Sequence, residues 1–405
     1  MSLPAAPTPP TGPRTTVPPG VVTLADHEAC ASTHLDPAAW AYFSGGAADE
    51  ITLAANRTAW DSLTLLPRVL RPLAGGHTRV ELLGRTLAHP ILLAPVAYQR
   101  MAHADGEIGM AYAAAALGAG LVLSTQASTR LEAVANAVRD DAGRGPLWFQ
   151  LYLQHDRDFT RELVERAERA GYEALVLTVD APCHGARDRE RRAGFCLPQG
   201  ISAANLLGML PAPQVPLAPG QSALFDELLH HAATWDDVQW LQSITRLPVL
   251  LKGVLHPDDA RQAAGMGVAG IIVSNHGGRT LDTTPATATM LPRIVEAVRA
   301  VDCALPVLVD GGIRRGTDVL KAMALGASAV LVGRPAVWGL ANAGAAGVAH
   351  VLRLLRDELE IAMALTGCAT LTDATPALAH AGMLANAPAV TTSGDERRGV
   401  DPSQV

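Results

Sequence analysis

The sequence predicts an α/β protein built as a (β/α)8 TIM barrel, on three observations. Eight short apolar runs recur along the chain, they do not alternate apolar with polar residues, and segments of helical period lie between them. Strands without alternation are covered on both faces, as parallel strands beneath helices are. The runs occupy residues 89–96, 121–126, 147–153, 174–180, 248–254, 270–277, 306–312 and 329–335.

Between these runs, apolar residues recur three and four positions apart, which is the period of an amphipathic helix. The main alternative is an open doubly wound sheet. The barrel is favoured because the strand and helix pattern repeats eight times and no Gly-x-Gly-x-x-Gly follows the first run. The helical segments occupy residues 106–119, 128–140, 158–172, 290–301 and 316–327.

One connection, after the fourth run, is too long for a simple crossover. Its residues 195–242 are rich in proline and small apolar side chains. Long excursions in compact domains are usually lids or binding loops. A membrane-contact patch is the alternative, but the segment lacks the lysines and arginines that hold anionic lipid.

Domain boundaries follow from composition. We expect a disordered proline-rich tail at residues 1–20, one catalytic domain with an N-terminal helical segment at 21–388, and a polar tail at 389–405. We expect neither a signal peptide nor a membrane-spanning segment.

The overall composition excludes several classes of protein. With 49% hydrophobic residues and 18% charged residues, the chain is an ordinary globular protein. A formal net charge of -7 offers no basic surface for nucleic acid. The 5 cysteines are scattered and odd in number, which indicates reduced thiols in the cytoplasm and neither a disulfide framework nor a metal site.

The carboxyl ends of the expected strands are unusually polar. In a barrel of this type the active site lies at those ends. A single buried histidine or lysine is usually a satisfied core group, but this many polar tips on one rim favour a site. The tips offer Ala97, Ser124, Gln150, Tyr152, Thr178, Asp180, Lys252, Ser274, His276, Asp310, Gly311, Gly312, Gly333 and Arg334.

The loops after the seventh and eighth runs read "DGGIRRG" and "GRP". These loops commonly bind phosphate in such barrels, because glycines let backbone N–H groups approach an anion. Arg314 and Arg334 add charged donors there. A tight turn alone would explain the glycines, but not the arginines in both loops.

Lys252 ends an apolar strand, so its ammonium needs an anion or an electron-rich partner, or it loses its proton. A Schiff base is conceivable. Stabilisation of negative charge on a reduced flavin fits the phosphate loops better, with flavin mononucleotide (FMN) as the cofactor.

The stretch "SNHGGR" places His276 as a proton acceptor and Arg279 as a bidentate clamp for a carboxylate. Asp180, at another strand tip, can hydrogen-bond the imidazole and stabilise its protonated form. Together these residues predict oxidation of a 2-hydroxy acid.

These motifs resemble the FMN-dependent L-2-hydroxy acid oxidases and dehydrogenases, a family that includes glycolate oxidase, lactate oxidase and mandelate oxidase and dehydrogenase. The resemblance runs from Trp40 to Cys368. It is carried by "APVAYQRMAHADGE", "QLYLQHDR", "LTVDAPCHGARDRE", "LLKGV", "SNHGGRTLD", "LVDGGIRRGTDVLKAMALGA" and "VGRP".

The resemblance implies a role for each matching residue. His276 is implied to be the base and Asp180 its partner, while Tyr152 and Tyr42 hydrogen-bond the substrate, whose carboxylate is held by Arg187 and Arg279. The FMN site is implied to comprise Pro95, Val96, Ala97, Ser124, Gln150, Thr178, Lys252, Ser274, Asp310, Gly311, Gly312, Arg314, Gly333 and Arg334. No metal is implied.

Two departures bear on specificity. Gln126 stands where glycolate oxidase has tryptophan, and His184 stands where it has leucine. Loss of the indole opens the pocket, so we expect a substrate larger than glycolate, such as mandelate or lactate. His184 has a second interpretation as a surface residue of the lid.

The expected product of electron transfer is peroxide, with oxygen as acceptor, because no haem domain precedes the barrel. The alternatives are a quinone-linked dehydrogenase, a non-catalytic flavin-binding barrel, and a flavin isomerase or nicotinamide-fed reductase. The resemblance also implies a homotetramer. From charge and composition we expect no nucleic-acid or membrane partner.

Overall fold

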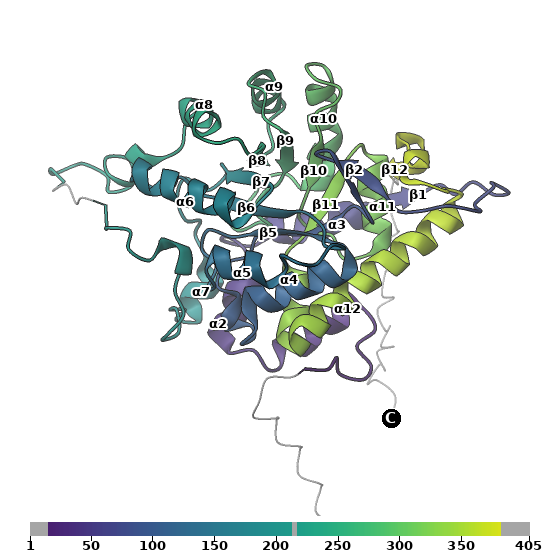
Figure 1. Cartoon of the computed structure of the whole chain (residues 1–405), viewed down its shortest axis with the longest axis horizontal. Coiled ribbons are helices and arrows are strands. Elements are labelled where there is room, and N and C mark those ends of the chain that lie inside the picture. The colour runs from purple at the N-terminus through teal and green to yellow at the C-terminus, as the bar shows by residue number, and fades with distance from the viewer. Residues whose placement is uncertain (1–14, 213–216, 382–405) are drawn as a thin grey trace, which may run out of the picture.

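In the computed structural model, which describes residues 15–212 and 217–381, parallel strands close into a barrel. The strands around the barrel follow the order β10-β11-β4-β5-β6-β7-β8-β9 (Figure 1). This closed order confirms the predicted (β/α)8 fold and rules out the open sheet. The strands are β4 Ile91–Leu93, β5 Gly120–Leu123, β6 Leu147–Leu151, β7 Ala174–Thr178, β8 Val249–Val254, β9 Gly270–Val273, β10 Val307–Val309 and β11 Ala329–Val332.

Helices surround the barrel on its outside (Figure 1). The five helical segments expected from periodicity are all present, and their ends shift by no more than three residues. The surrounding helices are α4 Gly106–Leu117, α5 Leu131–Ala137, α6 Arg157–Ala170, α8 Trp235–Ile244, α9 Pro257–Gly265, α10 Thr287–Arg299, α11 Gly316–Ala324 and α12 Arg334–Thr366.

Helix α6 illustrates how local sequence sets the helix ends. The Asp156 side chain accepts hydrogen bonds from the backbone N–H groups of Asp158 and Phe159, which have no partner within the helix. At the other end the chain leaves the helix through Gly171, whose φ of 89° is left-handed. The face between these caps buries Leu163, Val164 and Ala167 against the barrel.

The core has two layers. Side chains from alternate positions of each strand point inward and fill the barrel, among them Leu92, Val122 and Trp148. The remaining strand positions face outward and pack against the helices in a larger cluster. Because both faces of every strand are buried, the apolar runs in the sequence show no alternation.

A helical segment precedes the barrel, as predicted, and consists of α1 Leu24–Ser32, α2 Pro37–Ser44 and α3 Ile51–Ser62. Asp282, in the loop after β9, accepts hydrogen bonds from the backbone N–H groups of Ile51 and Thr52. This contact fixes the start of α3 beside the β9 loop. Helix α2, which carries Tyr42, is held near the carboxyl ends of the strands by Arg279, whose Nη1 donates to the Tyr42 carbonyl.

The long excursion after β7 contains the short helix α7 Asp188–Arg192 and the 3-10 turns η2 Ala204–Leu206 and η3 Leu228–His231. Helix α7 lies beside α2 (Figure 1). Farther along, Leu207, Leu210 and Phe225 are exposed. The first part of the excursion is therefore packed against the domain, whereas the later part presents apolar side chains at the surface.

The remaining elements are peripheral. Strand β1 Leu63–Leu65 pairs antiparallel with β12 Ala379–Ala381, and β2 Val80–Leu82 pairs antiparallel with β3 Arg85–Leu87. Short 3-10 turns complete the chain: η1 Gln99–Met101, η4 Leu371–Asp373 and η5 Pro376–Leu378.

Among the described residues, no helix is both long enough and apolar enough to cross a membrane. The predicted tail at 389–405 and residues 1–14 of the predicted N-terminal tail lie outside the described ranges.

Candidate active site

A cavity of about 850 Å³ lies at the carboxyl ends of the barrel strands. The tips or following loops of the eight barrel strands all contribute to its lining, together with α2 and the excursion after β7. Most residues predicted for the site line it: Tyr42, Pro95, Val96, Ala97, Ser124, Gln126, Gln150, Tyr152, Thr178, His184, Arg187, Lys252, His276, Arg279, Asp310, Gly311, Gly312, Arg314, Gly333 and Arg334.

Two predicted residues, Asp180 and Ser274, are not among the lining residues, but each contacts a side chain that lines the cavity. Asp180 is hydrogen-bonded to His276, and the Ser274 hydroxyl is 2.9 Å from Lys252 Nζ. Ser274 Oγ also accepts a hydrogen bond from the backbone N–H of His276 at 3.1 Å. The structure therefore places Ser274 as a support for two lining residues.

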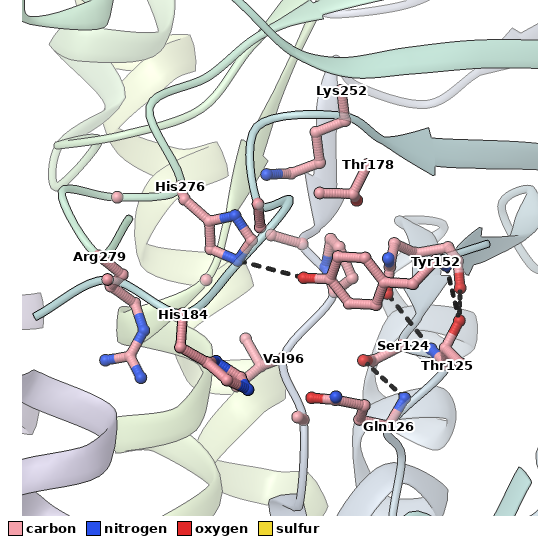
Figure 2. A pocket seen from close by; sticks show the side chains of 18 of the residues that line it. Val96, Ser124, Thr125, Gln126, Tyr152, Thr178, His184, Lys252, His276 and Arg279 are labelled. Carbon is pink, nitrogen blue, oxygen red and sulfur yellow. Dashed lines mark hydrogen bonds between the residues drawn. The ribbon is translucent and has the colours of Figure 1, made fainter. Parts of the chain in front are cut away.

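His276 and Asp180 form a hydrogen-bonded pair between two strand tips. His276 Nδ1 lies 2.8 Å from Asp180 Oδ1. Because a carboxylate only accepts, Nδ1 carries the proton, and in the neutral ring Nε2 keeps its lone pair. Nε2 points into the cavity and lies 3.4 Å from the Tyr152 hydroxyl (Figure 2). This tautomer makes Nε2 a proton acceptor.

The backbone around this pair is unusual in two places. His276 has a φ of 56°, in the left-handed region, where a non-glycine residue costs of order 1 kcal/mol or more. Gly253, just after Lys252, has a φ of 110°, and a Cβ there would lie 2.5 Å from Asp180 Cβ. Only glycine lets β8 pass this close to Asp180, so the aspartate can reach the imidazole.

The charge environment keeps Asp180 ionised. Burial by itself would raise the pKa of Asp180, but the charge and hydrogen bond of His276, together with the Lys252 ammonium, bring that pKa below its ordinary value. An ionised Asp180 stabilises the imidazolium that forms when His276 takes up a proton.

Lys252 stays charged although it is buried. Burial alone would lower its pKa, yet the carboxylates of Asp310 and Asp180 raise it above the ordinary value. Its Nζ lies 3.1 Å from Asp310 Oδ2. A Schiff base needs a neutral amine, so this environment argues against that alternative and for a fixed positive charge.

At one end of the cavity lie Arg314 and Arg334, with no carboxylate within 4 Å of either in the part of the chain that is described. Arg334 donates to the backbone carbonyls of Phe43, Gly45 and Gly277, and Arg314 stacks on Trp338 with Cζ 4.7 Å from the ring centroid. Burial, the largest cause, lowers the pKa of Arg314 to about 10 and that of Arg334 to about 9. Two buried cations without a contacting acid form a site for an anion.

The residues between that end and His276 fit a flavin mononucleotide. Gln150 Nε2 and Asp310 Oδ1 are buried and have no hydrogen-bond partner within the described ranges. Buried polar atoms are rarely left unpaired, so both atoms require a ligand with a donor and an acceptor. A flavin ring and its ribityl chain supply these groups, and the flavin phosphate supplies the anion for the two arginines.

Arg187 and Arg279 line the substrate end of the cavity, beside Tyr42 and His276, and this end adjoins Arg334, because Arg279 and Arg334 both donate to the Gly45 carbonyl. Arg279 Cζ is 4.9 Å from the centroid of the Tyr42 ring, and its Nη1 donates to the carbonyl of Gly45 at 2.9 Å. Burial, and next the charge of Arg187, lowers the pKa of Arg279. Two neighbouring arginines near an imidazole suit a carboxylate whose neighbouring hydroxyl faces Nε2.

Gln126 and His184 both point into the cavity from the side opposite Lys252 (Figure 2). Burial, and next Arg187, lowers the pKa of His184, which favours its neutral form. The His184 side chain lines the cavity and is also exposed to solvent, so both interpretations of this residue stay predictions. The positions of both residues make them walls for the part of a substrate beyond its carboxylate.

Three residues of the site were not identified from the sequence. Thr125 holds Gln150 in place, because its N–H donates to Gln150 Oε1 and its hydroxyl donates to the Gln150 carbonyl. Phe195 stacks on Tyr42 with ring centroids 4.7 Å apart. Glu190 contacts both Arg187 and Arg279. The apolar and charged neighbours of Phe195 and Glu190 in sequence give no sign of these contacts, which only the fold creates.

Comparison with known proteins agrees with this geometry. Residues 31–381 match the family of FMN-dependent dehydrogenases. An L-lactate oxidase of Alicycliphilus denitrificans is 50% identical, over 89% of this chain and 96% of its own, and glycolate oxidase 1 of Zea mays is 45% identical, over 88% and 94%. A crystal structure of mandelate oxidase with (S)-2-phenylpropionate superposes with a TM-score of 0.78 at 44% identity, covering 87% of this chain and 96% of that one.

Proposed function

Because the chain belongs to the family of FMN-dependent dehydrogenases and takes FMN as its cofactor, we propose that it oxidises L-2-hydroxy acids to 2-oxo acids. Electrons pass to oxygen, with peroxide as the second product. Relatives named L-lactate oxidase and glycolate oxidase, and structures of mandelate oxidase, support an oxidase over a quinone-linked dehydrogenase. The observation that carries the proposal is the His276–Asp180 pair facing two arginines in one cavity.

In this reaction the substrate carboxylate binds Arg187 and Arg279, with Tyr42 beside them. Its hydroxyl lies between Tyr152 and His276. His276 Nε2 accepts a proton from the substrate, and Asp180 stabilises the resulting imidazolium. Burial, the largest cause, raises the pKa of Tyr152, so its hydroxyl stays protonated and donates a hydrogen bond to the substrate.

FMN, when bound, accepts the two electrons that leave the substrate carbon. Lys252 provides a fixed positive charge in the middle of the cavity, supported by Ser274 and Asp310. Arg314 and Arg334, with the glycines 311, 312 and 333, hold the phosphate. The backbone of 95–97 and the side chains of Ser124, Gln150 and Thr178 provide polar contacts along the flavin.

The substrate is larger than glycolate, with lactate and mandelate as the first candidates. Gln126 and His184 form the wall that meets its side chain. A non-catalytic flavin-binding protein would need Arg314 and Arg334 for the phosphate. It would not need the His276–Asp180 pair or the arginines at the substrate end. A nicotinamide-fed reductase has no need of that arginine pair.

His276→Ala tests the proposal. The variant should bind FMN and remain yellow, because the side chains proposed to hold the phosphate are unchanged, while anaerobic L-lactate or L-mandelate should no longer bleach the flavin. Loss of general-base catalysis typically costs about 100- to 10,000-fold. Full-rate bleaching in this variant, compared with wild-type protein, would contradict the assignment of the base.

We further propose a homotetramer in the cytoplasm, with residues 21–388 as one catalytic domain. The match over residues 31–381 supports the domain boundary. None of the five cysteines, all within the described residues, forms a disulfide, which agrees with a reducing compartment. Sedimentation of the purified protein measures the number of subunits.

A further inference from the structure

Glu190 is the acid nearest to the arginines of the substrate end. Its Oε1 lies 2.9 Å from Arg279 Nη2 and 3.5 Å from Arg187 Nη1, so one carboxylate oxygen bridges both cations. All three side chains are largely buried, with exposed fractions of 13% for Glu190, 14% for Arg279 and 17% for Arg187. Charges buried to this extent are weakly screened by solvent and salt. A carboxylate that bridges the two arginines therefore weakens their attraction for an anionic ligand.

The two arginines keep binding capacity beyond Glu190. Arg187 Nε is buried and has no hydrogen-bond partner among the described residues. Arg279 Nη1 is used by backbone carbonyls, which leaves the Nε side of the guanidinium for a further acceptor. A substrate carboxylate can therefore bind while Glu190 stays in place.

The charges facing this end are few. Arg187 and Arg279 contribute two positive charges and Glu190 one negative charge, while partial burial and the charge of Arg187 hold the pKa of His184 below its ordinary value. Arg191 also lines the cavity mouth, but it is 71% exposed and pairs with Asp188. Arg187, Arg279 and Glu190 together carry one net positive charge, and the Arg334 guanidinium lies next to that of Arg279, because both donate to the Gly45 carbonyl.

Helix α7, which carries Glu190, is held in place from its other side. Arg189 Nη1 donates to Ser44 Oγ at 3.1 Å, and Arg189 Nη2 pairs with Glu50. Just before the helix, Gly185 packs so closely on the β9 loop that a Cβ would lie 2.1 Å from the Thr280 carbonyl oxygen. These contacts fix the position of α7, so Glu190 is held beside the two arginines.

We propose that Glu190 is a specificity-determining residue that lowers the positive charge of the substrate end by one, so that the enzyme selects monocarboxylate over dicarboxylate 2-hydroxy acids. This inference rests on the proposed function. Removing a negative charge from the site favours a dianion more than a monoanion of similar size, because the electrostatic gain scales with the charge of the ligand.

The test compares two unreactive probes of similar size, propanoate with one carboxylate and malonate with two, on FMN-loaded protein at a pH where both are fully ionised. Dissociation constants come from the change in the flavin absorption spectrum. For Glu190→Gln, the affinity for malonate relative to propanoate should rise by about tenfold or more, from the loss of one weakly screened charge. Glu190→Asp keeps the charge and should retain the wild-type ratio.

Glu132→Gln is the matched control, because Glu132 pairs with Arg166 away from the cavity and its loss should leave the ratio unchanged. The flavin spectrum of each variant shows that it is folded and loaded. An unchanged or lower ratio in Glu190→Gln, with wild-type protein still oxidising 2-hydroxy acids, would overturn the role of Glu190 alone. Failure of every 2-hydroxy acid to reduce the wild-type flavin would overturn the proposed function and this inference with it.

Discussion

Two pairs of buried arginines line the cavity and adjoin at the Gly45 carbonyl, to which Arg279 and Arg334 both donate, but the pairs differ in their other partners. Arg314 and Arg334 contact backbone carbonyls and an aromatic ring, with no carboxylate within 4 Å in the described ranges. Arg187 and Arg279 share Glu190. No contacting carboxylate offsets the two positive charges of the first pair, whereas the Glu190 carboxylate offsets one of the two positive charges of the second pair.

This difference matches the ligands that the two ends would hold. A phosphate carries close to two negative charges, and a cofactor must stay bound through many turnovers. A monocarboxylate carries one charge and must leave as product. Ion pairs shielded from water are strong when their charges match. Two uncompensated arginines therefore suit a cofactor phosphate that stays bound, whereas a pair partly neutralised by Glu190 suits a substrate that must leave as product.

The largest expected effect comes from Arg279→Ala, which removes half of the substrate pair. We expect kcat/KM for L-lactate or L-mandelate to fall about 100- to 1,000-fold, since truncating one partner of a buried charge pair costs about 3 kcal/mol or more. FMN content should not change. Steady-state kinetics with the flavin spectrum as loading control would measure both, and loss of FMN with normal kcat/KM would reverse the assignment of the two ends.

Arg314→Ala should produce the opposite pattern. The FMN dissociation constant should rise about 30-fold, since a hydrogen bond to a charged group contributes about 2 kcal/mol. Arg314 is chosen over Arg334 because Arg334 and Arg279 both donate to the Gly45 carbonyl, which couples the two ends.

The measurement for Arg314→Ala is fluorescence quenching of FMN titrated with apoprotein. Once saturated with FMN, the variant should keep the wild-type KM for substrate. A raised KM with unchanged FMN affinity would mean that Arg314 does not belong to the phosphate end.

The smallest expected effect comes from Gln126→Trp, which changes an uncharged wall at the substrate end. A larger ring there should lower kcat/KM for mandelate relative to glycolate by about tenfold, within the range for hydrophobic pocket changes. Competition between the two acids measures the ratio directly. A ratio that moves towards mandelate would show that Gln126 does not limit the room for the substrate side chain.

Much of the fold follows from local sequence. Each barrel strand is a short apolar run, and its carboxyl end carries the polar residues that line the cavity, so the strand pattern predicts both the barrel and its rim. Helix α12 was not predicted from periodicity. It runs from Arg334 to Thr366 and is interrupted at Ala343 and Gly344, where the backbone leaves helical geometry. Its alanine-rich, largely buried first part shows no polar face to reveal it.

Ser274 shows what a local pattern leaves out. Its position at the tip of β9 placed it on the rim, and its contact with flavin stays a prediction. The strand ends one residue earlier, and the hydroxyl contacts Lys252 and the His276 backbone. Sequence places a residue on a rim. It does not determine which atoms of that residue face the cavity.

The sequence by itself determined the barrel, the polar rim, and the position of His276, Arg279 and Lys252 on that rim, because apolar periodicity and strand-end position are local properties of the chain. Only the tertiary structure decided that Asp180 reaches His276 past Gly253, and that Glu190 on α7 bridges two arginines 92 residues apart in number. Those contacts join segments distant in the chain, and their charges acquire their effect only when burial removes water from around them.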